Sequence, residues 1–273
     1  MKRRLTASVA ICVFAACLPA RASQPAECSG DEWVRAGAEC LHVETYSSET
    51  LSGRPTLVVA VHGDSPFSNP QYQYQWAEHV ARENPNVIAV GVLRPGYTDG
   101  ANHHSTGVRG MTTGDNYTPG VVDAIADAVR NLRATFSPAH VVIAWHSGGA
   151  ALAAGVMGKH PGVADAAVLV SCPCDVARWR AHMKAKQGGA IWDRPVDAVS
   201  PDAVVDGIDP AAKLVVIVGD HDDVAPPELS RDYRDRLQKR ALSVTYVEVP
   251  GTHEIFADPA VFRSTAELLR SLR

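Results

Sequence analysis

Short runs rich in valine and isoleucine alternate with longer amphipathic segments along most of this chain, and this alternation limits the folds open to it. The apolar runs are Thr56–Val61, Val87–Val92, Val141–Trp145, Ala166–Val170, Leu214–Val218 and Val244–Val249. The segments with helical spacing are Gln75–Glu83, Val121–Thr135, Ala150–Lys159, Pro227–Arg240 and Pro259–Leu272. Strands that are apolar on both faces and alternate with helices are typical of a mostly parallel sheet covered by helices on each side. The sequence therefore predicts an α/β fold, with an antiparallel pair of strands added within Trp33–Ser48.

Residues 1–22 have the composition of a secretory signal peptide. Basic residues precede the apolar run Leu5–Cys17, and A-R-A at positions 20–22 offers small residues for cleavage before Ser23. The apolar run is too short to span a bilayer, and no later segment is long enough, so no stable membrane insertion is expected. We therefore expect an exported protein, periplasmic or secreted. A lipid-modified Cys17 is the alternative, although Phe14 fits a lipoprotein cleavage box poorly.

The mature chain predicted by this cleavage has 251 residues, enough for one large α/β domain over residues 23–273. The signal peptide takes four basic residues with it, so the net charge changes from −4 to −8. A negative chain without a basic stripe argues against nucleic acid as a partner. The sequence leaves the oligomeric state open.

Four cysteines belong to the mature chain, and an even number in an exported protein indicates disulfides. Cys28 and Cys40 are the natural local pair. A bridge between Cys172 and Cys174 would be geometrically strained, so cross-pairing of the two sets and free buried thiols both stay open. Zinc ligation is less favoured, because the chain lacks two C-x-x-C pairs.

The stretch VVIAWHSGGA, Val141–Ala150, leads from an apolar strand into Ser147 and two glycines. A serine on a tight strand-to-helix turn projects its hydroxyl above the sheet, and Gly148 and Gly149 supply the small residues that such a turn needs. The helix N-terminus that follows offers positive potential to a developing oxyanion. Trp145 stands where such turns usually have glycine, so the alternative is a small-residue turn with no catalytic part.

Two later strands end beside residues that can activate a serine. VIVGDHDDVAPP offers the acids Asp220, Asp222 and Asp223, and VPGTHEIF offers His253. A serine hydroxyl needs a base to take its proton, and histidine suits that task near neutral pH. The imidazole in turn needs an acid that fixes its tautomer. The order Ser147, aspartate, histidine is the chain order of the Ser-His-Asp triad in one fold family.

From Thr56 to its end, over three-quarters of its length, the chain resembles the α/β-hydrolase fold family. The matching pieces are VVAVHGD, AWHSGGA, VIVGDHDDVAPP and VPGTHEIF, in the family's order and at familiar separations. In the family's G-x-x-D-x-x-x-P pattern, Gly219 and Pro226 align Asp222 with the acid, and Asp223 is the main competitor. Trp145 departs from the family's pattern.

The resemblance implies a serine hydrolase in which Ser147 is the nucleophile, His253 the base and Asp222 its acid partner. The turn at residues 62–64 matches the family's segment after the third strand, which implies that the backbone N–H groups of Asp64 and Gly148 hold the oxyanion. A carboxylate aimed at the site would oppose the developing negative charge. We therefore expect the Asp64 side chain to turn away and bond a local amide or the neighbouring serine at position 65.

The remaining histidines do not form a metal motif. His62, Asp64, His103 and His104 could be imagined as ligands, but adjacent histidines do not normally reach one ion, and H-E-x-x-H is absent. His146, directly before the serine, is expected to be structural. No metal, nucleotide or other cofactor is expected.

Two long connections, Pro95–Pro119 and Ser171–Lys213, follow the carboxyl ends of strands, where ligands bind in α/β sheets. The second, with one helix predicted at Val176–Lys186, is read as a short cap over an accessible site. This favours a carboxylic ester of small or medium size as substrate. The alternatives are a short peptide or amide, cleaved as in prolyl-oligopeptidase-like peptidases, and acyl transfer to another alcohol. A non-catalytic binding protein of the same fold also stays open, favoured by Trp145 and Asp64.

Overall fold

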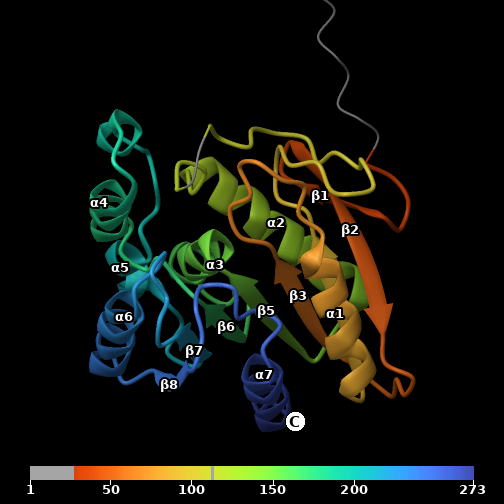
Figure 1. Cartoon of the computed structure of the whole chain (residues 1–273). Coiled ribbons are helices and arrows are strands. Elements are labelled where there is room, and N and C mark those ends of the chain that lie inside the picture. The colour runs from red at the N-terminus through yellow and green to blue at the C-terminus, as the bar shows by residue number, and fades with distance from the viewer. Residues whose placement is uncertain (1–27, 112–113) are drawn as a thin grey trace, which may run out of the picture.

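All six apolar runs form strands of one sheet (Figure 1). The computed structural model describes residues 28–111 and 114–273, so the predicted signal peptide lies outside the described residues. The strands of the described part are β1 (Trp33–Ala36), β2 (Glu39–Ser47), β3 (Thr56–Val61), β4 (Val87–Val92), β5 (His140–His146), β6 (Ala166–Val170), β7 (Lys213–Gly219) and β8 (Ser243–Val249).

The helices between the strands also follow the predicted pattern. In the described part they are α1 (Tyr72–Glu83), α2 (Pro119–Phe136), α3 (Gly148–Lys159), α4 (Val176–Gln187), α5 (Pro201–Val204), α6 (Pro227–Lys239) and α7 (Pro259–Ser271), with 3-10 turns η1 (Ala190–Asp193) and η2 (Val205–Gly207). α2 begins earlier than predicted because Thr118 caps it and Pro119 occupies its first turn. None of these described helices is long and apolar enough to cross a membrane.

The strand order of the sheet is β1-β2-β4-β3-β5-β6-β7-β8. β2 pairs antiparallel with both β1 and β4, and every other neighbouring pair is parallel. This confirms the predicted mostly parallel sheet and its antiparallel start. The parallel strands all end at the same edge, so residues that follow β3, β5, β7 and β8 can meet there.

Helices pack against both faces of the sheet (Figure 1). Along β3, Leu57, Val59 and Val61 belong to the core that contains residues of α2, α3 and α6. Val58 and Ala60 belong to the other core, which contains residues of α1 and α7. The alternation along one strand explains why the apolar runs are continuous, since both of their faces are buried.

The segment between β6 and β7 contains α4, α5 and the two 3-10 turns, of which the sequence predicted only α4. Trp179 of α4 clusters with Ala225 and Leu229. Its indole N–H also donates to the carbonyl of Val224 at 2.8 Å. These contacts hold α4 against the loop between β7 and α6.

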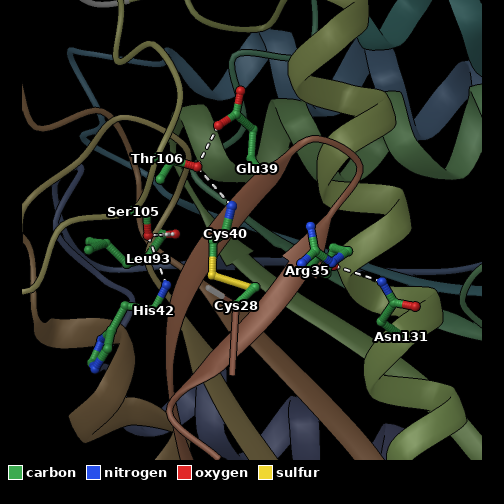
Figure 2. The surroundings of a disulfide bond; sticks show 9 residues. All are labelled: Cys28, Arg35, Glu39, Cys40, His42, Leu93, Ser105, Thr106 and Asn131. Carbon is green, nitrogen blue, oxygen red and sulfur yellow. Dashed lines mark hydrogen bonds between the residues drawn. A yellow bond between two sulfur atoms is a disulfide. The ribbon is translucent and has the colours of Figure 1, made fainter. Parts of the chain in front are cut away.

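The predicted Cys28–Cys40 disulfide is present and fastens the N-terminal segment to β2 (Figure 2). A second bridge joins Cys172 to Cys174, the pairing that the sequence left open. Figure 2 also shows Thr106, whose hydroxyl accepts the N–H of Cys40 at 2.8 Å and donates to the carboxylate of Glu39. These bonds tie the first half of the Pro95–Pro119 connection to β2. The sequence predicted this connection only as a loop that contacts substrate.

Candidate active site

Ser147 lies in the turn between β5 and α3, in a backbone conformation that L-residues rarely adopt. Its φ is 54° and its ψ is −126°. The surroundings hold this conformation, because the N–H of Ser147 donates to the carbonyl of Val170 on β6 at 2.8 Å. A Cβ on Gly149 would lie 2.6 Å from the carbonyl oxygen of His62, so the close approach of α3 to β3 requires glycine there. These are the features of a nucleophile turn between strand and helix.

The ring of Trp145, the residue that departs from the usual turn, is buried in the core on the side of α2 and α3. Its indole N–H donates to the carbonyl of Val59 on the adjacent strand β3, at 2.9 Å. The ring is thus directed across the neighbouring strand. The first two turns of α3 consist mainly of alanine and glycine, which leaves room for so large a ring in this core. Trp145 is accommodated without displacing Ser147 from the turn.

The structure brings together the three residues predicted as a triad. Nε2 of His253 lies 2.7 Å from Oγ of Ser147. Nδ1 of His253 lies 2.9 Å and 3.0 Å from the two carboxylate oxygens of Asp222. Since Nδ1 faces an acceptor, it carries the ring hydrogen, and the lone pair of Nε2 is left to accept the hydrogen of the serine hydroxyl.

The loop after β7 distinguishes the candidate acids. The side chain of Asp222 is 0% exposed, and its Oδ1 also accepts the N–H groups of Val224 and Ala225 at 3.0 Å and 2.8 Å. The side chain of Asp223 is 72% exposed and pairs with Lys186 at 2.6 Å. Only Asp222 of these two carboxylates contacts His253.

The backbone of His253 is held by residues that the sequence did not place in the site. The hydroxyl of Ser171 donates to the His253 carbonyl at 2.9 Å, and Nε2 of His146 lies 3.0 Å from the same oxygen. The hydroxyl of Tyr72 accepts the N–H of Gly63, so its own hydrogen goes to Nδ1 of His146 at 3.1 Å. His146 therefore carries its hydrogen on Nε2, and burial lowers its pKa to about 3. It stays neutral and holds the carbonyl of His253, which is a structural role.

The two backbone N–H groups predicted for the oxyanion, those of Asp64 and Gly148, have no acceptor among the described residues. A Cβ on Gly63 would lie 2.9 Å from the Cβ of Ser147, so the turn after β3 passes directly beside the serine. The Gly63 carbonyl accepts from Nδ1 of His62 at 2.7 Å. Because a trans peptide directs its N–H opposite to its C=O, the N–H of Asp64 points away from the His62 ring.

The expectation that the Asp64 side chain bonds Ser65 or a local amide is wrong. Oδ1 of Asp64 accepts from Nη1 of Arg94 at 2.8 Å, and its Oδ2 accepts from the hydroxyl of Tyr117 at 2.5 Å and the N–H of Gly114 at 2.8 Å. Ser65 bonds within its own loop instead. The partners of Asp64 come from segments 30 to 53 residues later in the chain, which local sequence reasoning cannot reveal.

Metal-ligand spacing occurs once in the described part of the chain, at His42, Asp99 and His103, whose ligand atoms lie within 4.8 Å of one another. The two imidazole rings stack with centroids 3.9 Å apart and planes 14° from parallel. A metal bound to imidazole lies in the ring plane, so one ion cannot satisfy both rings in this arrangement. Both nitrogens of His62 are engaged, by the Gly63 carbonyl and the Arg94 N–H.

Comparison with known proteins finds similarity in structure only. No protein-family model matches the chain, and no curated protein matches its sequence. The acylaminoacyl peptidase of Pyrococcus horikoshii superimposes with a TM-score of 0.65 and 12% identity, covering 87% of this chain and 40% of that one. This chain thus spans well under half of that peptidase.

Two solved structures match over nearly their whole length. Est1E from Butyrivibrio proteoclasticus has a TM-score of 0.62 and 15% identity, covering 89% of this chain and 99% of its own. Proline iminopeptidase from Mycobacterium smegmatis has a TM-score of 0.60 and 14% identity, covering 88% and 97%. At such identities the similarity concerns the fold.

Proposed function

This chain has the α/β-hydrolase fold, and we propose that it is a serine hydrolase that cleaves a carboxylic ester through an acyl-enzyme. One observation carries the proposal, namely the continuous chain of hydrogen bonds from Asp222 through His253 to the hydroxyl of Ser147. A buried acid, an oriented imidazole and a serine on a strained turn are what nucleophilic acyl transfer needs.

The reaction begins when Oγ of Ser147 attacks the ester carbonyl carbon and its proton passes to Nε2 of His253. Asp222 stabilises the imidazolium that forms. The N–H groups of Asp64 and Gly148 stabilise the oxyanion of the tetrahedral intermediate. The intermediate then collapses, and His253 returns the proton to the departing alcohol. A water molecule, activated by the same imidazole, attacks the acyl-enzyme and releases the acid and the free serine.

Two features support an ester of small or medium size. Ser147 is partly accessible, and the segment at residues 171–213, which we propose as the cap, contributes one helix of more than a single turn. Such a cap leaves an open site. Peptide cleavage is the second candidate, because peptidases are among the structural neighbours. A binding protein without catalysis is less favoured, since neither Trp145 nor Asp64 disturbs the hydrogen bonds that join Asp222, His253 and Ser147.

Ser147→Ala tests the function directly. We expect wild-type protein to hydrolyse short acyl esters with an initial burst of alcohol, and Ser147→Ala to lose at least about 10⁴-fold in kcat. Ser65→Ala, in the exposed loop after the oxyanion turn, is the matched control and should keep full activity. Comparison of kcat/KM for the esters with kcat/KM for matched aminoacyl and peptidyl amides distinguishes an esterase from a peptidase. Turnover that survives in Ser147→Ala would show that Ser147 is not the nucleophile.

Export to an oxidising compartment is part of the proposal, supported by the Cys28–Cys40 and Cys172–Cys174 bridges. We expect the exported protein to begin at Ser23 and to resist alkylation until it is reduced, after which all four cysteines react. Intact-mass analysis before and after reduction measures both. Alkylation of cysteines in the native protein would contradict the disulfides. A lipid-modified N-terminus at Cys17 would show that the protein is anchored to a membrane and not secreted.

A further inference from the structure

We propose that Arg94 and Tyr117 are positioning residues that make an aspartate compatible with the oxyanion site. They fix the Asp64 carboxylate and balance its charge, so that the N–H of the same residue can stabilise an oxyanion. The inference rests on the proposed serine hydrolase function.

The carboxylate of Asp64 lies close to the second expected donor. A Cβ on Gly148 would be only 2.6 Å from Cγ and from Oδ1 of Asp64. A full negative charge at that position would repel the negative charge that develops on the substrate oxygen. An unbalanced Asp64 would therefore work against the site to which its own backbone contributes.

Arg94 supplies the balancing charge. Its Nη1 lies 2.8 Å from Oδ1 of Asp64, and the two side chains are 0% and 2% exposed. Little water screens this pair, so the attraction between the two charges is strong. The guanidinium also lies over the rings of Tyr97 and Tyr117, 5.1 Å and 5.9 Å from their centroids.

The charge of Arg94 is directed to Asp64 and to no other acid among the described residues. Its Nε and Nη2 are buried and have no hydrogen-bond partner there. An arginine whose role was to cross-link the fold would be expected to use these donors. Here two of its three nitrogens are left unpaired while the third meets one carboxylate, which points to charge compensation.

The backbone of Arg94 supports the same turn from its other side. The Arg94 N–H donates to Nε2 of His62 at 3.1 Å, and Nδ1–H of His62 donates to the Gly63 carbonyl at 2.7 Å. Burial drives the pKa of His62 well below its usual value, so the ring stays neutral and keeps this tautomer. The peptide between Gly63 and Asp64 is thus fixed through its carbonyl, and the residue that follows is fixed through its side chain.

Arg94→Met, Asp64→Asn and the double variant test the proposal as a cycle. We expect Arg94→Met to lower kcat about 100-fold with little change in KM, because it leaves a carboxylate without its counter-charge beside the oxyanion. Asp64→Asn in the same chain should restore kcat to within about ten-fold of wild type. A loss of kcat in Arg94→Met that Asp64→Asn does not reverse would overturn the proposal.

Tyr117→Phe has a matched control in Tyr233→Phe, since the buried hydroxyl of Tyr233 has no partner in the described part. We expect the first to lower kcat about ten-fold and the second to leave it unchanged. Equal effects of the two substitutions on kcat would show that Tyr117 is not a positioning residue.

A readout without turnover separates this inference from the proposed function. Arg94→Met should lower Tm by about 10 °C, because it strands a buried charge, and the double variant should recover most of that loss. Absence of recovery would overturn the ion-pair role. A wild type without hydrolytic activity would instead overturn the proposed function, and with it the oxyanion role, while the Tm cycle would still decide whether Arg94 balances Asp64.

Discussion

Replacement of His253 by alanine is expected to lower kcat for ester hydrolysis about 10⁶-fold. Without the imidazole, the 2.7 Å contact with Nε2 is lost, and no other described residue offers the Ser147 hydroxyl a base within hydrogen-bonding distance. The oxyanion donors and substrate binding should still support a residual rate above that of the uncatalysed reaction. Steady-state and single-turnover kinetics on one ester measure the loss.

His221→Ala is the matched control for this variant. The side chain of His221 is 79% exposed and its contact is with Asp220, so its removal should leave kcat unchanged. The fold of His253→Ala should survive, because the His253 carbonyl, which Ser171 and His146 hold, is retained. A loss of less than about 100-fold in a folded His253→Ala protein would exclude His253 as the base.

Asp222→Asn is expected to lower kcat about 10⁴-fold. The amide can still accept the N–H groups of Val224 and Ala225 through its oxygen, so the loop should keep its shape. Its NH₂ group then faces Nδ1 of His253 and forces the hydrogen of the ring onto Nε2. That tautomer cannot accept the proton of the serine, and the imidazolium loses its counter-charge.

Asp223→Asn is the paired measurement, and it should change kcat by less than about two-fold. Asp223 is exposed and its ion pair with Lys186 is solvent-screened. Both variants remove one carboxylate from adjacent positions, so the comparison isolates contact with His253. Equal losses would show that the assignment of the acid within this loop is wrong.

The elements of the fold could be predicted because their signals are local. Val–Ile runs and amphipathic segments located the parallel strands and the longer helices to within three residues at either end. The G-x-x-D-x-x-x-P pattern of the family that the chain resembles favoured Asp222 over Asp223, and Asp222 is the one of the two that contacts His253. Ser147 and His253 follow strand ends, where a parallel sheet gathers side chains at one edge.

The surroundings of the proposed triad could not be predicted in the same way, because they depend on contacts between distant segments. Arg94 and Ser171 both lie just beyond the carboxyl ends of strands, a signal that could have singled them out, but nothing local indicated their partners. Tyr117 meets Asp64 across 53 residues. The bridge between Cys172 and Cys174 was equally undetermined, since spacing argued against it.

Trp145 illustrates how tertiary packing overrides a local rule. The turn pattern asks for a small residue at that position because strand and helix approach closely. In the structure the alanines and glycines of α3 provide the small side of the contact, and the large ring lies across β3. The requirement for space is met, but by different residues from those of the usual pattern.

Labelling of the mature protein with a fluorophosphonate probe, with the adduct mapped by peptide mass spectrometry, tests most directly whether Ser147 is an activated nucleophile. Such a probe reacts only with a serine whose hydroxyl has been activated by a neighbouring base. We expect one adduct, on Ser147, which disappears in His253→Ala although that protein stays folded. An unlabelled native protein, or an adduct on another serine, would contradict this role of Ser147.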